Sequence, residues 1–227
     1  MASVSAAESH PFLRSPNRTL LVLSVPVLLS MIAEPLTGLV DTAFVARLGA
    51  APLAALGAGT VALSSVFWVF NFLQIGTQTE VAARLGSDNR AAAAEITGLA
   101  LLLSGAIGTI LAILAIIAAP WMAEAMGAGG ALLADTVAYI RWRAPGAPAV
   151  LVTLAAFGAL RGGQRMTAPL LVAVGVNVLN IVLDALLIFG FGPIPAFGVA
   201  GAAFASSLSQ WAGAAWAVAA ALRPDQS

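Results

Sequence analysis

The chain has 227 residues, of which 60% are hydrophobic and 9% charged, with a mean hydropathy of +0.98, so it carries more apolar surface than a soluble domain can bury. Ten acidic residues balance ten basic ones, which excludes the basic excess typical of nucleic-acid-binding proteins. There is no cysteine, and the single histidine, His10, lies in the polar N-terminal tail; these facts argue against a thiolate site, a transition-metal centre and a histidine-assisted protease. No cofactor is expected, apart from a bound Na⁺ or a transported H⁺.

Residues 1–18 lack the basic segment and adjoining apolar run of a cleaved signal peptide, and we interpret them as a cytoplasmic tail. After this tail, apolar stretches of the roughly 20 residues needed to cross a hydrocarbon core recur six times within residues 19–222. They lie near 19–45, 53–81, 93–120, 134–159, 167–190 and 198–221. Because lipid-exposed backbone must satisfy its own hydrogen bonds, we predict an all-α membrane protein, a six-transmembrane-helix bundle.

The distribution of arginine predicts the orientation of these spans. On the side of the N-terminus fall Arg14, Arg18, Arg84, Arg90, Arg161, Arg165 and Arg223, whereas Arg47, Arg141 and Arg143 fall on the other side. Cytoplasmic loops carry the excess of basic residues, so both termini, including the end at 223–227, are expected in the cytoplasm. The expected location is the cell inner membrane.

Polar side chains occur at membrane depth, where an ionisable group costs about 2.5–3.5 kcal/mol. In the fifth span Asn177, Asn180 and Asp184 are spaced i, i+3, i+7, which places them on one stripe of a helix. Similar spacing relates Glu34, Thr37, Gly38 and Asp41 in the first span, and Asn71, Gln74 and Gln78 in the second. Each set forms a single polar face.

The helical rise of about 1.5 Å per residue converts sequence position into depth. Asp41 lies about 22 residues into the first span and Asp184 about 17 into the fifth, so both fall in the outer half of the membrane. Ser206, about eight residues from the outer end of the sixth span, reaches a similar level, and Tyr139 lies slightly above it. We therefore expect one shared polar layer.

Two interpretations of these groups stay open. Hydrogen bonds between helices, each contributing about 0.6 kcal/mol, account equally well for the amides of the second span. For Asp41 and Asp184 we favour function, because an amide would serve as well if hydrogen bonding were the only need, and Glu34 is intermediate. A buried carboxyl group can exchange a proton or, with amide and hydroxyl oxygens beside it, hold Na⁺. Pro26 is either a bending point that responds to this change or a static kink.

Three segments in order resemble the N-terminal lobe of multidrug and toxic compound extrusion (MATE) transporters, nearest the DinF-like branch. They are PLTGLVDTAFVARLGAAPLAALG at 35–57, NVLNIVLDALLIFGFG at 177–192 and GVAGAAFASSLSQ at 198–210. Members of this family pair two six-helix lobes and export organic, often cationic, compounds by antiport against Na⁺ or H⁺. The resemblance implies that this chain is one such lobe.

The resemblance also implies roles for particular residues. Asp41, Asn180 and Asp184 correspond to the polar cluster of the cation-binding lobe, and they are the candidate ligands for Na⁺. Ser206 stands where the family commonly has a threonine, and Tyr139 and Pro26 resemble a lobe tyrosine and a helix-one proline linked to bending. Glu34, Asn177, Gln74 and Gln78 are candidate supporting polar groups.

Some features depart from the family pattern. VARLG at 45–49 replaces a more usual glycine-containing turn, Gln78 and Glu80 add polarity at the inner end of the second span, and six spans are half of the family's number. The expected function is cation-coupled export of drug-like compounds, with the bilayer and a second half or a second copy as partners and no nucleic acid. The alternatives are a truncated or inert half-transporter, a membrane scaffold, and a lipid-linked oligosaccharide flippase; an enzyme is not expected.

Overall fold

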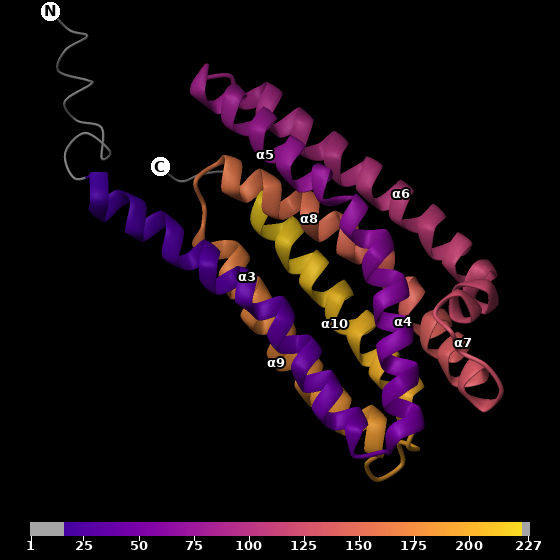
Figure 1. Ribbon diagram of the computed structural model, residues 1–227. Coiled ribbons are helices and arrows are strands. Elements are labelled where there is room, and N and C mark those ends of the chain that lie inside the picture. The colour runs from indigo at the N-terminus through magenta and orange to yellow at the C-terminus, as the bar shows by residue number, and fades with distance from the viewer. Residues whose placement is uncertain (1–15, 224–227) are drawn as a thin grey trace, which may run out of the picture.

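The computed structural model describes residues 16–223, in which every regular element is helical (Figure 1). The elements are α3 (Pro16–Ala46), α4 (Ala50–Val69), α5 (Asn71–Gly86), α6 (Arg90–Ala125), α7 (Ala131–Arg143), the 3₁₀ turn η1 (Ala144–Gly146), α8 (Ala147–Gly162), α9 (Thr167–Phe189) and α10 (Gly198–Ala221). Helices α4 and α5 continue each other across Phe70, and α7 continues through η1 into α8. The described part of the chain is thus a bundle of six helical spans, which confirms the predicted fold class.

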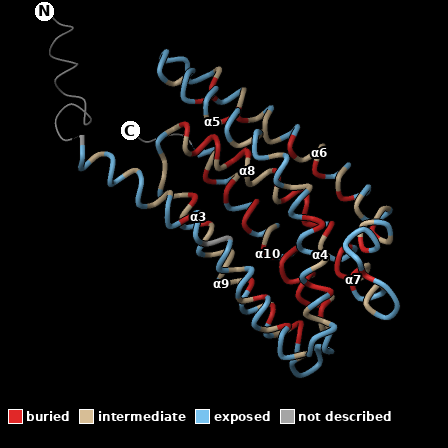
Figure 2. The backbone as a smooth tube through the Cα atoms, viewed as in Figure 1, coloured by how far each residue is buried: buried red, intermediate tan, exposed pale blue. Residues whose placement is uncertain are grey.

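The six spans differ in polarity. Among the described residues, five helical stretches are long and apolar enough to cross a membrane, and α10 is outside that set. The difference has a packing cause, because α10 consists largely of small residues buried against α9, α8 and α7. Figure 2 shows this contrast, with buried positions concentrated on α8 and α10 and exposed positions along α3 and α6. The face of a helix that packs on protein can be built of small residues, and the opposite face of α10 exposes Leu208, Trp211 and Trp216.

The spans on the outside of the bundle expose large apolar side chains. Leu21 of α3 is 63% exposed, and Leu102 of α6 is 76% exposed. Such surfaces would be unfavourable in water but are suited to contact with lipid tails.

Two glycines set how closely neighbouring helices approach. A Cβ atom at Gly201 of α10 would lie 2.4 Å from the backbone oxygen of Leu187 on α9. At Gly158 of α8 it would lie 2.5 Å from the backbone oxygen of Gln74 on α5. Since any larger residue would push these helices apart, the two glycines fix the spacing of α9 with α10 and of α5 with α8.

The break between α7 and α8 is stabilised by side chains of α10. Pro145 lies in η1, and a turn of this kind frees backbone carbonyls from the helical ladder. Ser207 Oγ donates to the carbonyls of Trp142 (2.9 Å) and Arg143 (3.2 Å), and Trp211 Nε1 donates to that of Pro145 (3.0 Å). The freed carbonyls therefore find partners inside the bundle, as the interior of a membrane requires.

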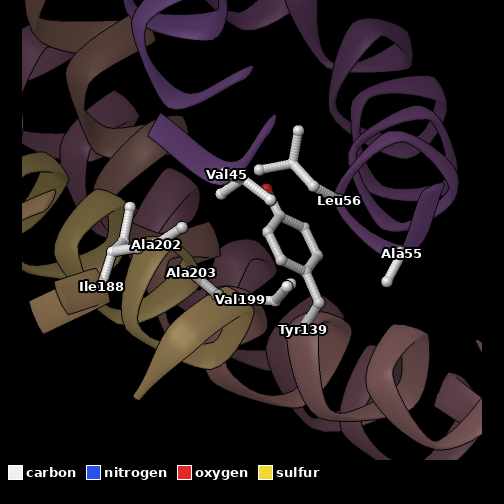
Figure 3. Packing of buried hydrophobic residues seen from close by; sticks show 8 residues of the cluster. All are labelled: Val45, Ala55, Leu56, Tyr139, Ile188, Val199, Ala202 and Ala203. Carbon is white, nitrogen blue, oxygen red and sulfur yellow. The ribbon is translucent and has the colours of Figure 1, made fainter. Parts of the chain in front are cut away.

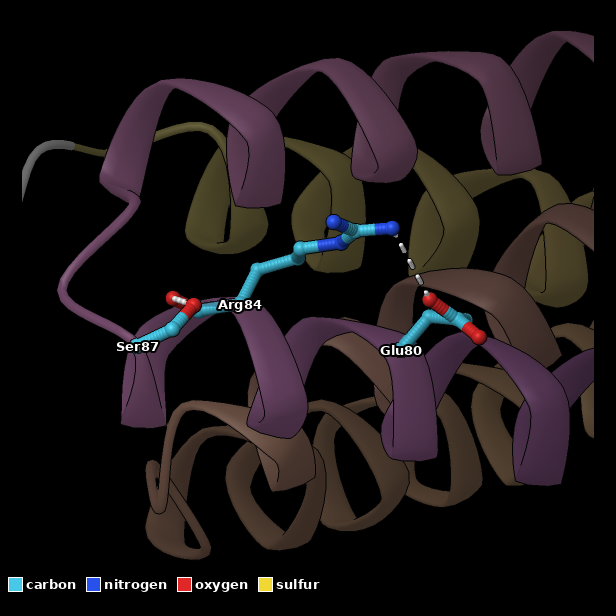
Figure 4. A network of polar contacts seen from close by, with 3 residues as sticks. All are labelled: Glu80, Arg84 and Ser87. Atoms are coloured by element: carbon cyan, nitrogen blue, oxygen red, sulfur yellow. Dashed lines mark hydrogen bonds and ion pairs between the residues drawn. The ribbon is translucent and has the colours of Figure 1, made fainter.

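The end of α5 is polar and exposed, unlike the helix interiors. Arg84 Nη2 lies 3.7 Å from Glu80 Oε2, one helical turn earlier, and Ser87 Oγ donates to the Arg84 carbonyl (Figure 4). Both charged side chains are about half exposed, so this pair contributes little to stability. After the turn, Asn89 caps α6 by accepting from the Ala92 amide at 3.0 Å.

Candidate cation-binding site

Three helices bring four of the expected residues into one buried cluster. Asp41 comes from α3, Asn180 and Asp184 come from α9, and Ser206 comes from α10. Ser206 Oγ donates to Asp41 Oδ2 at 3.2 Å, and Asn180 Nδ2 donates to Ser206 Oγ at 3.5 Å. Asn180 and Asp184 have no exposed surface, and Asp41 and Ser206 are 8% and 5% exposed. We call these four residues the polar cluster.

The cluster holds more hydrogen-bond acceptors than the surrounding protein satisfies. The buried oxygens without a hydrogen-bond partner are Asp41 Oδ1, Asn180 Oδ1 and both carboxyl oxygens of Asp184. The Asp184 carboxyl also lies close enough to that of Asp41 for the two to interact electrostatically. Buried polar atoms normally have partners, so a group of unsatisfied oxygens from two carboxyls and one amide is a suitable environment for a proton or a hard cation such as Na⁺.

A layer of apolar side chains, shown in Figure 3, lies one helical turn from the polar cluster on α3, α9 and α10. Val45 lies one helical turn beyond Asp41, Ile188 one turn beyond Asp184, and Ala202 one turn before Ser206. All three belong to a single buried apolar group. This layer separates the cluster from the loops that follow α3 and precede α10.

Tyr139 lies in the apolar layer and not in the hydrogen-bond network of the polar cluster. Its ring packs with Val45 and Leu56 in Figure 3, and its hydroxyl shares a 2.9 Å hydrogen bond with Thr60 on α4. The ring fits against Gly59, where an added Cβ would come within 2.3 Å of Cδ1. The structure therefore places Tyr139 next to the cluster, as expected, but gives its hydroxyl a different partner.

On the opposite side, the polar stripe of α9 continues one turn farther. The Thr37 hydroxyl on α3 donates to Asn177 Oδ1, and Asn177 Nδ2 donates to the Ala173 carbonyl at 2.9 Å. This pair joins α3 to α9 next to Asp41, which is a supporting position of the kind expected for Asn177. The side chain of Glu34 lies outside the described residues.

Two of the expected supporting residues lie elsewhere in the bundle. Gln74 and Gln78 are on α5, which packs mainly against α8 and α6 and not against the helices of the polar cluster. Their backbone carbonyls face Gly158 and Gly162 of α8. The geometry places the backbone of both residues at the contact between α5 and α8.

Pro26 lies within α3, half-buried, and the helix continues past it. The first half of α3 is tied to α8 by Arg161, whose Nη2 donates to Ser30 Oγ at 3.2 Å. Ser30 Oγ in turn donates to the Val27 carbonyl at 2.7 Å. Pro26 is therefore next to a polar contact between helices that bending of α3 would alter.

Arg143 is a residue of the site that was not predicted from the sequence. It falls in the predicted span 134–159 but was used only as a marker of the side opposite the N-terminus; the structure places it at the end of α7, within the helical stretch Ala131–Gly162. Its guanidinium lies close enough to attract the Asp41 carboxyl, and its Nη1 is buried without a hydrogen-bond partner. The signal was present, since Arg143 is four residues after Tyr139 and so lies on the same face of a helix.

A helical bundle that holds unsatisfied carboxyl and amide oxygens between three of its membrane-length helices has the architecture of a membrane transport protein. The MatE family model matches residues 26–186, and the chain belongs to this family, the MATE transporters. The family resemblance found in the sequence is thereby confirmed.

Individual relatives and a solved structure agree with this assignment. The chain is 33% identical to Protein DETOXIFICATION 44, chloroplastic, of Arabidopsis thaliana, over 83% of this chain and 38% of that protein. It is also 33% identical to DNA damage-inducible protein F of Escherichia coli, over 88% of this chain and 43% of that protein. A crystal structure of MATE in the bent conformation superposes with a TM-score of 0.82 at 29% identity, covering 89% of this chain and 44% of that one. The chain thus spans less than half the length of these relatives.

Proposed function

We propose that the chain is the N-terminal half of an antiporter that exports drug-like or toxic organic compounds in exchange for H⁺ or Na⁺. The observation that carries this proposal is the polar cluster, in which two buried carboxyl groups and one amide leave oxygens unsatisfied between α3, α9 and α10. A cation bound there would join the three helices through Asp41, Asn180 and Asp184, with Ser206 holding Asp41 in place. No organic or transition-metal cofactor enters this mechanism.

Cation binding changes the charge between α3 and α9, and this change supplies the energy for a conformational step. With the site empty, two carboxylates repel each other; with a proton or Na⁺ between them, α3 can pack closely on α9. Pro26 removes a backbone donor from the first half of α3 and so makes bending easier there. We propose that occupation of the site changes the bend of α3 and thereby releases substrate on the outer side.

The complete transporter, in this proposal, contains a second six-helix half, either a companion chain or a second copy. Alternating access in transporters built from repeats requires one half to move against the other. The proposal places the protein in the inner membrane with both termini in the cytoplasm, as the arginine distribution predicts.

The test is dye efflux from membrane vesicles that contain the native chain or its variants, driven by an imposed H⁺ or Na⁺ gradient. Asp41→Asn and Asp184→Asn are expected to abolish gradient-driven efflux, because an amide neither exchanges a proton nor offers a charged ligand. Asp135→Asn is the matched control, since Asp135 is an exposed carboxylate on α7. Unchanged coupled efflux in both cluster variants would contradict the mechanism, and no efflux by the native chain even when a second half is supplied would favour the inert scaffold.

A further inference from the structure

A second polar site lies beside the polar cluster, around Arg143. A pocket of about 200 Å³ opens between α4, α8 and α10, at the break between α7 and α8. Arg143 is the only charged residue among those that line it. A positive group at this depth in a membrane-spanning stretch is costly unless it has a partner or a purpose.

The surrounding protein satisfies the hydrogen-bond donors and the charge of the Arg143 guanidinium only in part. Nη1 is buried without a hydrogen-bond partner, and the ion pair found among the described residues joins Arg84 and Glu80, not Arg143. Asp41 attracts the guanidinium but lies beyond ion-pair distance of it. The buried Nη1 lies against Gly146, out of reach of the pocket, but Arg143 is also one of the residues that line the pocket. A guanidinium that lines a pocket is best satisfied there by a carboxylate or phosphate.

The rest of the pocket has the chemistry of a site for an amphiphile. Thr60, Ser64 and Gln210 contribute hydroxyl and amide groups, and the aromatic residues Phe67 and Trp68 line the same pocket. An apolar wall with a few polar groups and one charge is typical of small-molecule sites. We therefore propose that this pocket binds an organic anion, with its carboxylate or phosphate on Arg143 and its apolar part against Phe67 and Trp68.

The pocket is also connected to the polar cluster through adjacent residues of α10. Ser206 donates to Asp41 in the cluster, and Ser207 donates to the carbonyl of Arg143 at 3.2 Å. A shift of α10 on ligand binding therefore moves both sites together. This inference rests on the proposed export function. It identifies an anionic substrate, whereas the sequence predicted drug-like compounds that include organic cations.

The experiment measures binding by calorimetry with the full chain in phosphatidylcholine nanodiscs, corrected by empty nanodiscs. The probes are three matched compounds: naphthalene-2-carboxylate, 2-naphthylmethanol and 2-naphthylmethylammonium. The anion is expected to bind at least about tenfold more tightly than either other probe, as one charge-assisted contact implies. Arg143→Gln should remove this preference, Arg143→Lys should retain part of it, and Arg141→Gln, an exposed neighbour on α7, should retain all of it.

A further variant covers the case in which Arg143→Gln fails to fold. Leu154→Trp fills the pocket while keeping Arg143 and is expected to weaken binding of all three probes. Equal affinities of the native chain for anion and cation would overturn the inference. Unchanged naphthoate binding in folded Arg143→Gln would also overturn it, because that is the result expected if the arginine serves only as counter-ion to Asp41.

Phosphatidylglycerol added to the nanodiscs distinguishes the sources of the anion. Competition with naphthoate supports a lipid headgroup, and no competition supports a soluble anion. Since binding requires no transport, loss of efflux with retained anion binding would contradict the proposed function alone.

Discussion

Asp184 is the residue on which the polar cluster depends most. Both of its carboxyl oxygens are buried without a donor group and interact only with the Asp41 carboxyl, whereas Asp41 also has the Ser206 hydroxyl. Leaving such a group unsatisfied costs about 1–3 kcal/mol, and more if it is charged. Cation binding would explain why these carboxyl oxygens are buried at this cost. Hydrogen bonding between helices does not explain it, because the oxygens accept no such bond.

Ser206 is expected to hold Asp41 in the geometry that binds the cation. Ser206→Ala removes the 3.2 Å bond to Asp41 Oδ2 and leaves Asn180 Nδ2 without its acceptor. We expect the cation concentration for half-maximal efflux to rise about tenfold, because a hydrogen bond to a charged group contributes about 1.5–3 kcal/mol. Ser206→Thr keeps the hydroxyl and should behave as native.

The control for this prediction is Ser104→Ala, since Ser104 is equally buried but lies on α6, outside the cluster. An equal effect of Ser104→Ala and Ser206→Ala would indicate general destabilisation and not a role of Ser206 at the site.

The residues of the cluster could be predicted from sequence, but their contacts could not. The i, i+3, i+7 spacing places Asn177, Asn180 and Asp184 on one stripe, and helical rise gives Asp41 and Ser206 a similar depth. Which hydroxyl bonds to which carboxyl depends on how α3 and α10 rotate against α9, and no local pattern specifies that rotation.

At the scale of the elements, the short distance between α9 and α10 brings Ser206 next to Asn180. This spacing depends on Gly201, whose missing side chain lets α10 approach the Leu187 carbonyl. The sequence indicated close helix contacts from its many small residues, but it did not indicate which glycine faces which helix.

Gly201→Ala should therefore destabilise the bundle, although alanine is the better helix former. The added Cβ would meet backbone at 2.4 Å, and overpacking of this kind typically costs about 1–3 kcal/mol. In detergent we expect a lower Tm, by about 2–4 °C for each kcal/mol. Gly98→Ala on α6, which has open space at its Cβ, is the control and should leave the Tm unchanged or slightly higher. Equal Tm values for the two variants would contradict the packing argument.

The bend of α3 is the second feature that belongs to this scale. The chain contains no cysteine, so spin labels can be placed at Leu21→Cys on α3 and Leu171→Cys on α9, both exposed positions. We expect the distance between the labels to change when H⁺ or Na⁺ is added, and Pro26→Ala to reduce that change, because it restores a backbone donor. A distance that is independent of both cations would show that Pro26 is a static kink.

Arg143 and α10 show why element-level prediction was incomplete. The sequence placed Arg143 inside the predicted span 134–159 and used it only to assign the orientation; its surroundings depend on the break at Pro145 and on α10, which satisfies the freed carbonyls. Helix α10 falls outside the set of spans apolar enough to cross a membrane, and one of its faces is packed on α9, α8 and α7 while the other is exposed. Both features arise from tertiary contacts that a hydropathy pattern does not contain.

At the scale of the whole molecule, the six spans correspond to less than half of the relatives that the chain matches. The pocket around Arg143 is lined partly by exposed polar residues, including Ser64 and Asn71, on the face formed by α4, α8 and α10. Exposed polar groups on a membrane-embedded bundle are best placed against protein or a water-filled cavity. We expect a second half to cover this face.

Transport should therefore require two halves. Two copies of the chain joined head to tail through a flexible linker are expected to restore efflux in vesicles, because both termini are predicted on the same side of the membrane. The same fusion carrying Asp184→Asn in both copies should be inactive. Efflux by a chain that stays monomeric would contradict the requirement for a second half.

The most direct test of the central claim is infrared difference spectroscopy of the carboxyl groups in the purified chain, recorded when the pH is changed and when Na⁺ is added. It examines cation binding at the polar cluster without requiring transport or a second half. The proposal predicts a carboxyl band that responds to at least one of the two cations, is lost in Asp184→Asn and is retained in Asp135→Asn. A band that responds to neither cation, or that persists unchanged in Asp184→Asn, would contradict the assignment of the cluster as the coupling site.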